Sequence, residues 1–216
     1  MAKKIIGICG LIGNGKDTAA GFLIEEGYER ISFAGVLKDV CASLFGWDRI
    51  LLEGNTPESR AFRERPDEWW SKRLGIENFT PRYALQNIGT NVFREHFHKD
   101  IWVAAAERRI MATDKNVVIS DARFFNELQS IKNLGGELAA VWRNETPVWW
   151  PNAVQTNTTE PDNEYIIYDE GVHMEVAYPE VHPSEWSWAG WDFDHELSNN
   201  STLNAFKQET LNKLLR

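Results

Sequence analysis

A glycine-rich segment near the start of the chain carries the most recognisable chemistry. Residues 10–18 read Gly-Leu-Ile-Gly-Asn-Gly-Lys-Asp-Thr and match the phosphate-binding pattern G-x4-G-K, except that Asp17 stands where Ser or Thr is usual. Glycines let the backbone wrap so that its N–H groups face phosphate oxygens, while Lys16 can reach the β- and γ-phosphates as a point charge. An apolar run precedes the segment and a helix-compatible stretch follows it, so an ordinary glycine turn is the weaker interpretation. We predict that ATP phosphates contact Gly10, Gly13, Asn14, Gly15, Lys16, Asp17 and Thr18.

The unusual Asp17 bears on the metal that would accompany ATP. A carboxylate is a hard oxygen ligand that Mg²⁺ accepts directly or through water. Thr18 offers the hydroxyl that the standard pattern would supply one position earlier. The sequence therefore predicts Mg²⁺ at Asp17, with Thr18 and Asp121 as further candidate ligands.

A second group of polar residues follows the apolar run Val117–Ile119. Asp121, Arg123 and Glu127 come directly after it, and ligands of open parallel sheets bind where strands end. Asp121 could hold Mg²⁺ through water or fix a substrate group, and the forked guanidinium of Arg123 suits a phosphate. The alternative is a structural ion pair between Asp121 and Arg123.

A third set of polar residues has helical spacing. Arg82, Gln86 and Thr90 recur at intervals of four, which places them along one helical face. A guanidinium, an amide and a hydroxyl could together meet a phosphate, a base edge and a sugar. A merely solvated face is an equally good interpretation of this spacing alone.

The elements that must position these residues alternate between strands and helices. Strands are expected at 5–9, 28–33, 116–120 and 137–142, and helices at 17–26, 34–45, 83–97, 102–112, 126–134 and 202–215. This alternation predicts an α/β fold with a parallel sheet. The length favours one domain, residues 1–216, with an Arg-rich substrate-binding insert at 48–82 and an acidic lid at 144–196. The 48–82 segment could instead be a solvated helical hairpin.

The distribution of charge excludes some partners. The formal net charge is -9, and residues 144–206 hold twelve Asp or Glu and no Lys or Arg. Such a balance repels a nucleic acid polymer. The chain has only two cysteines and no apolar stretch long enough to span a membrane, so we expect a cytoplasmic protein without a membrane partner.

Several motifs, taken in order, resemble the phage-type deoxynucleoside monophosphate kinases. They are Gly-Lys-Asp-Thr at 15–18, Phe33–Asp39, Leu85–Thr90, Asp121-x-Arg123-x-x-x-Glu127, Val141-Trp142-Arg143, His182-Pro183-Ser184-Glu185 and Leu197–Leu203. The resemblance runs nearly end to end and implies a P-loop NTPase three-layer sandwich of the nucleoside monophosphate kinase type. Asp17 is usual in that family, whereas Asn200-Ser201 replaces its commoner Asp-Gly, which leaves nucleobase contacts at this turn least secure.

The resemblance also implies an activity, the transfer of phosphate from ATP to a deoxynucleoside monophosphate for phage DNA precursor synthesis, which would occur in the host cytoplasm. Acceptor contacts are expected at Lys38, Arg82, Gln86, Gly89, Thr90, Trp102, Asp121, Arg123 and Glu127. A phosphate acceptor needs no strong base, so Lys16, Arg123, Arg143 and Mg²⁺ are expected to act by positioning and charge neutralisation. The alternatives are dephospho-coenzyme A kinase and a non-catalytic nucleotide-binding switch, and a homodimer remains open.

Overall fold

The computed structural model describes residues 3–158 and 173–216 of the chain. These residues divide into two compact units, which we describe separately. The first unit comprises residues 1–31 and 112–216, and the second comprises residues 32–111. Within the described residues, no helix is both long and apolar enough to cross a membrane.

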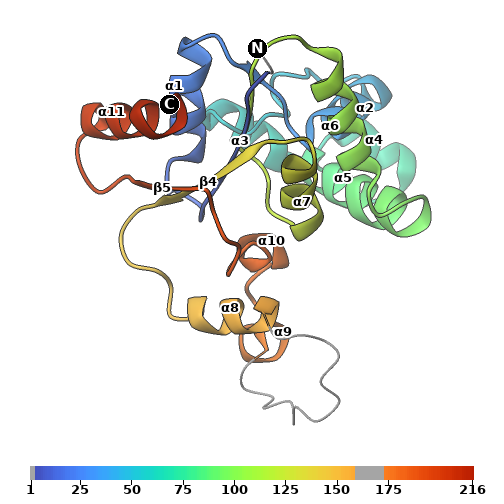
Figure 1. The fold of residues 1–216 in the computed structure, drawn as a ribbon. Coiled ribbons are helices and arrows are strands. Elements are labelled where there is room, and N and C mark those ends of the chain that lie inside the picture. Colours follow the sequence, from blue (N-terminus) through green and yellow to red (C-terminus); the bar gives the residue numbers. More distant parts are fainter. Residues whose placement is uncertain (1–2, 159–172) are drawn as a thin grey trace. The chain divides into compact units, whose positions relative to one another are not determined.

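A five-stranded parallel sheet forms the centre of the first unit (Figure 1). Its order is β2-β3-β1-β4-β5, and every pairing is parallel. The strands are β1 Ile5–Cys9, β2 Glu29–Arg30, β3 Val117–Ile119, β4 Glu137–Trp142 and β5 His195–Ser198. Every residue of β1 and β3 is buried, as expected for inner strands covered on both faces. The predicted α/β class is confirmed.

Helices cover both faces of this sheet and make the three layers. Helix α1 (Lys16–Glu25) contacts α11 (Leu203–Leu214), β1 and β3, whereas α7 (Phe125–Asn133) packs against β1 and β4. Figure 1 shows α1 and α11 beside each other, with α7 on the other side of the strands. The carboxyl ends of the strands, where the expected phosphate-binding residues lie, are held by this core.

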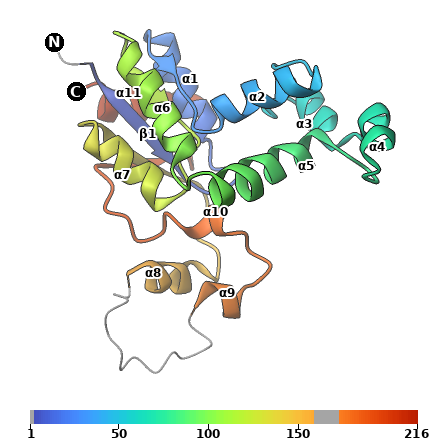
Figure 2. The same cartoon turned by 90° about the vertical axis from the view of Figure 1, so that its right-hand side faces the viewer.

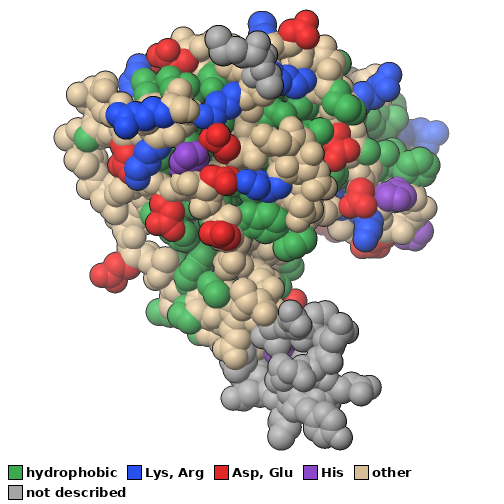
Figure 3. Space-filling view, viewed as in Figure 1, with side chains coloured by type: hydrophobic (Ala, Val, Ile, Leu, Met, Phe, Trp, Pro, Cys, Tyr) green, Lys and Arg blue, Asp and Glu red, His purple; other side chains and the backbone are tan. Residues whose placement is uncertain are grey.

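The acidic segment between β4 and β5 has a small core of its own. It contains α8 (Trp150–Thr158), α9 (Met174–Ala177) and α10 (Pro183–Trp186), which pack around Ala153, Met174, Trp186 and Ala189 (Figure 2). Edge-on and tilted ring contacts among Trp142, Trp150 and Trp188 join it to the end of β4. On the face seen in Figure 3, the described residues of α8, α9 and α10 show no Lys or Arg side chain, in agreement with the absence of both residue types from 144–206.

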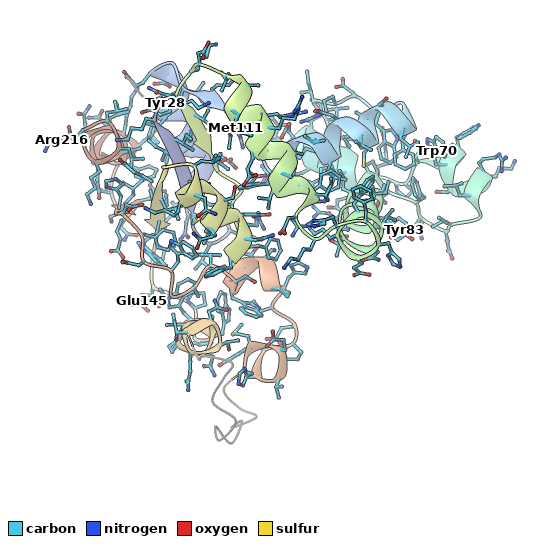
Figure 4. All side chains as sticks on the ribbon, turned by 45° about the vertical axis from the view of Figure 1, so that its right-hand side comes forward. Tyr28, Trp70, Tyr83, Met111, Glu145 and Arg216 are labelled. Atoms are coloured by element: carbon cyan, nitrogen blue, oxygen red, sulfur yellow. The ribbon has the colours of Figure 1, made fainter. Side chains whose placement is uncertain are left out.

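The second unit is helical and has an aromatic core. Its helices are α2 (Gly35–Phe45), α3 (Pro57–Glu64), α4 (Glu68–Leu74), α5 (Pro81–Gln86), a π-helix η1 (Asn87–Arg94) and α6 (Ile101–Ala112). Ring contacts run from Trp70 through Phe45 and Phe79 to Tyr83, with Trp70 and Tyr83 labelled in Figure 4. Aromatic burial of this kind supplies most of the cohesion of a small helical unit.

Three expectations about elements differ from the structure. The strand expected at 28–33 shrinks to β2, and the helix expected at 83–97 is divided into α5 and η1. The 48–82 segment contains the short helices α3 and α4, each begun by a side-chain cap, from Thr56 and Asp67 respectively. Strand β5 was not predicted at all. It is an edge strand with one buried residue, Leu197, so it lacks the continuous apolar run of the other strands.

Candidate active site

The glycine-rich loop connects β1 to α1, as the sequence predicts. Gly15 has φ +104°, a left-handed conformation that favours glycine, and it serves as the N-cap of α1. The Lys16 ammonium group folds back over the loop and donates to the carbonyl oxygens of Gly10 (2.7 Å) and Leu11 (2.9 Å). Burial lowers the pKa of Lys16 below its usual range, and the nearby Arg123 guanidinium lowers it further. A bound polyphosphate would supply the counter-charge that this pair of cations needs.

Asp17 is held by two groups that the sequence did not reveal. Its Oδ1 accepts hydrogen bonds from Arg30 Nη2 at 2.6 Å and Ser120 Oγ at 2.7 Å. Arg30 also donates to Ser120 Oγ at 3.0 Å, so each of the three side chains is hydrogen-bonded to the other two. Arg30 ends β2 and Ser120 follows β3, and their positions at the ends of adjacent strands were the only signal that could have suggested this contact.

The turn after β3 brings Arg123 together with the lid segment. Arg123 Nη1 donates to Glu185 Oε1 at 3.1 Å and to Ser184 Oγ at 3.4 Å. Both partners lie in α10, within the His-Pro-Ser-Glu motif. Glu185 also acts electrostatically on Lys16, since its negative charge opposes the lowering of the lysine pKa. Glu185 is therefore an anionic group that interacts with both of the cations expected to bind phosphate.

Glu127 has a different environment from the other expected acceptor contacts. The residue is only 2% exposed, and its Oε2 accepts hydrogen bonds from the backbone N–H groups of Arg123 (2.8 Å) and Phe124 (3.3 Å). These bonds fix the turn that carries Asp121 and Arg123 at the start of α7. The buried Glu127 carboxylate thus stabilises the conformation of this turn.

Arg143 follows β4 directly and has an exposed side chain. The alternative role considered for it was an ion pair with Glu145 or another acidic residue of the lid. Across residues 3–158 and 173–216, the structure records no hydrogen bond or ion pair of the Arg143 side chain. Its guanidinium is accessible to a ligand, and its role in transfer stays a prediction.

The carboxylates at this edge fit the ordinary requirements of Mg²⁺. Magnesium bound with nucleotides keeps several waters and uses one or two carboxylates plus the phosphates. Asp17 is exposed, and Oδ2 of its carboxylate is not used by Arg30 or Ser120; Thr18 is exposed beside it. Within the described ranges, no group of three or more His, Cys, Asp or Glu could hold a metal alone. The residues suit a metal that arrives with a nucleotide.

The second unit holds the remaining expected acceptor residues, beginning with Lys38 on α2. Lys38 Nζ donates to Glu53 Oε2 at 2.6 Å, and Arg49 links Glu53 to Asp39 with hydrogen bonds of 2.5 Å each. Arg109 also donates to Asp39. Burial alone would raise the pKa of Glu53, but the hydrogen bond and charge of Lys38, together with Arg49, hold it below the usual range. The sequence analysis identified Lys38 but missed the network that orients it.

The predicted face of Arg82, Gln86 and Thr90 crosses the junction between α5 and η1. Four residues exceed one turn of an α-helix, whereas they fall short of one turn where hydrogen bonds run from i to i+5. Gln86 is therefore rotated slightly past Arg82 around the helix axis, whereas Thr90 is rotated slightly back from Gln86. Gln86 and Thr90 are exposed, while Arg82 is partly buried and pairs with Glu64 of α3.

The π-helix is anchored at Gly89 by two close contacts. Trp102 Nε1 donates to the Gly89 carbonyl oxygen at 2.9 Å, and Trp102 is only 4% exposed. A Cβ on Gly89 would lie 2.6 Å from Leu37 Cδ2, so a larger residue there would require the Leu37 side chain to shift. Trp102 and Gly89 thus pack under the face that carries Thr90, rather than being exposed on it.

The parallel sheet and its phosphate loop place the chain among the P-loop NTPases. The chain is 36% identical, over 152 residues, to a protein of Acanthamoeba polyphaga mimivirus provisionally named as a deoxynucleotide monophosphate kinase, with 64% of this chain and 74% of that protein covered. It is 25% identical to the deoxynucleoside-5'-monophosphate kinase of Escherichia phage T5, over 96% of this chain and 94% of that protein. The chain belongs to the deoxynucleotide monophosphate kinase family.

Comparisons of other kinds add only general information. A comparison with models of known protein families finds no match. A gluconokinase from Sinorhizobium meliloti 1021 aligns at 14% identity and TM-score 0.41, covering 100% of this chain and 93% of that one. A dephospho-CoA kinase from Campylobacter jejuni aligns at 16% identity and the same TM-score, covering 97% and 94%. At these values neither bears on which acceptor this chain uses.

Proposed function

We propose that the protein transfers the γ-phosphoryl group of ATP to a deoxynucleoside monophosphate, producing ADP and the deoxynucleoside diphosphate. The observation that carries the proposal is that Arg123 lies near enough to Lys16 of the phosphate loop to lower the pKa of Lys16, within a chain of this kinase family. Lys16 reaches the β- and γ-phosphates, and Arg123 neutralises charge that develops on the transferred group. An anionic acceptor oxygen needs no proton removed, so the site requires cations and alignment more than a base.

The phosphate loop is assigned to ATP, and residues of the loop and of the strand ends are assigned to Mg²⁺ and to the charge of the phosphates. The residues expected to bind ATP are Gly10, Gly13, Asn14, Gly15, Lys16, Asp17 and Thr18. Asp17, Thr18 and Asp121 would hold Mg²⁺, which supplies charge neutralisation at the phosphate oxygens. Arg143 is the proposed additional cation, because the lid offers none.

The acceptor contacts proposed within the second unit are Lys38, Arg82, Gln86 and Thr90, and those proposed within the first unit are Asp121 and Arg123. Lys38 and Arg82 would meet the phosphate of the acceptor, and Gln86 and Thr90 its base and sugar. Gly89 and Trp102 would support the helix that carries Thr90, and Glu127 would support the turn that carries Arg123. The exposed Gln86 and Thr90 support this assignment, as does the support that Glu53 gives to Lys38.

An ADP-release assay tests the proposal directly. ATP and Mg²⁺ are supplied with each deoxynucleoside monophosphate, each ribonucleoside monophosphate and dephospho-coenzyme A in turn. Release is expected with at least one deoxynucleoside monophosphate and not with dephospho-coenzyme A. Lys16→Ala is the control, and a variant that retains a tenth of the wild-type kcat would refute the role given to the loop.

A further inference from the structure

The turn after β5 reaches back to the phosphate loop through Asn199. The backbone N–H of Asn199 donates to the Trp142 carbonyl oxygen at 2.8 Å, immediately beyond the last paired residues of β4 and β5. The side-chain Nδ2 of Asn199 donates to the carbonyl oxygen of Asn14 at 2.8 Å. One residue thus connects the end of the sheet to the middle of the glycine-rich loop.

Asn14 completes the connection from the other side. Its side chain is buried, with 5% of the residue exposed, and its Nδ2 donates to the Val141 carbonyl oxygen at 2.9 Å. The loop is therefore tied to two successive carbonyl groups at the end of β4, directly through Asn14 and indirectly through Asn199. Gly15 lies against this bridge, because a Cβ there would come within 2.6 Å of Asn199 Nδ2.

The bridge fixes the orientation of the peptide group between Asn14 and Gly15. A trans peptide is planar, and its C=O and N–H point in opposite directions. Because the Asn14 carbonyl is held toward Asn199, the Gly15 N–H must point to the opposite side. Successive N–H groups of this loop are the expected phosphate donors, so the orientation of this peptide matters for phosphate binding.

We propose that Asn199 is a positioning residue for the phosphates of the nucleotide, acting through the Asn14–Gly15 peptide and not through the base. The inference rests on the proposed function, since it requires a polyphosphate at the loop. It differs from the contact with the nucleobase that the family resemblance suggested for this turn. A residue that orients the loop should affect every polyphosphate ligand equally, whether or not the ligand carries a base.

Two substitutions one residue apart separate this role from a general effect on the fold. Asn199→Asp keeps the size of the side chain but removes the donor to Asn14. Asn200→Asp is the matched control, because it adds the same charge while keeping the oxygen that accepts from the Asn144 N–H at 2.7 Å. Asn199→Ala removes the donor without adding charge. Losing one neutral hydrogen bond should weaken binding about 2-fold to 10-fold.

The experiment measures the dissociation constants of inorganic tripolyphosphate and ADP by titration calorimetry, alongside the KM of the acceptor. Both ligands should bind more weakly to Asn199→Ala by the same factor, and Asn199→Asp should weaken both more than Asn200→Asp does, with the acceptor KM unchanged. Weaker binding of ADP alone would show contact with the base and overturn the proposal, as would unchanged binding of both. A wild-type protein that bound neither ligand would instead refute the proposed function. Thermal unfolding of each variant confirms that it is folded at the assay temperature.

Discussion

Glu185 is the group whose removal should strengthen nucleotide binding. In the free protein its carboxylate accepts a hydrogen bond from Arg123 Nη1 at 3.1 Å and also partly compensates the charge of Lys16. A polyphosphate seated on the loop brings the same sign of charge to the same two cations. The carboxylate must then leave, or it repels the ligand. We predict that Glu185→Gln lowers the dissociation constant of ADP.

The size of this effect follows from the exposure of the pair. The Arg123 side chain is 38% exposed and the Glu185 side chain 20%, so solvent screens much of their attraction. Pairs of this kind contribute roughly 0.2–1 kcal/mol, which corresponds to tightening of up to about fivefold. A larger gain would require a more deeply buried carboxylate than the structure shows.

The pH dependence of ADP binding provides an independent test of the role of Glu185. Lys16 must be protonated to attract phosphate, and its pKa in the free protein is lowered first by burial and then by Arg123, while Glu185 raises it. Affinity should therefore fall as pH rises through this lowered pKa. Without the Glu185 charge the pKa drops further, so the fall should begin at a lower pH in Glu185→Gln. The same shift affects the free energy of unfolding of the wild type. Burial disfavours the charged ammonium form of Lys16, so Lys16 destabilises the fold below its lowered pKa. This destabilisation is relieved as pH rises.

Titration calorimetry with ADP between neutral and alkaline pH measures both effects. Glu180→Gln is the matched control, because Glu180 is an exposed acid of the same segment. Tighter binding at neutral pH and an earlier alkaline decline are expected only for Glu185→Gln. Weaker binding by this variant would refute the reasoning, since it would mean that Glu185 orients Arg123 while the nucleotide is bound.

Three other substitutions test the roles assigned to single residues. Asp17→Asn should raise the Mg²⁺ concentration needed for half-maximal rate while leaving metal-free ADP binding nearly unchanged; an unaltered Mg²⁺ titration would assign Asp17 to its structural contact with Arg30. Arg82→Ala should raise the KM of the monophosphate and leave the KM of ATP unchanged in steady-state assays, whereas an equal effect of Glu64→Gln would identify a structural pair. Arg143→Ala should lower kcat at least tenfold, about 1.4 kcal/mol or more of transition-state stabilisation, but less than Lys16→Ala does. Normal kcat with a lower melting temperature would make Arg143 a structural anchor.

The sequence predicted those parts of the fold in which local pattern and burial agree. The inner strands are continuous apolar runs, and the loop before Lys16 has a glycine pattern with few other structural uses, so both were located correctly. The last helix, expected at 202–215, was also located correctly, and the Thr202 side chain caps it by accepting from the Ala205 N–H. Strand β5 was missed because an edge strand can hold a single buried residue and still pair fully along its backbone.

The contacts around the candidate site were harder to predict because they join residues far apart in the chain. Arg30 and Ser120 meet Asp17 only once the strands are ordered, and Glu185 meets Arg123 across 62 positions. The π-helix likewise depends on tertiary packing at Gly89, which spacing in the sequence does not encode. The sequence indicated which residues could bind phosphate or metal, whereas the hydrogen-bond partners of those residues could be identified only in the folded structure.

The destination of the γ-phosphoryl group tests the central claim most directly. ATP labelled with ³²P at the γ position is incubated with Mg²⁺, the protein and a deoxynucleoside monophosphate, and the products are separated by chromatography. The proposed reaction predicts label in the deoxynucleoside diphosphate, in amounts equal to the ADP formed, and no transfer by Lys16→Ala. Label found only in inorganic phosphate, or retained in ATP with every deoxynucleoside monophosphate supplied, would contradict it.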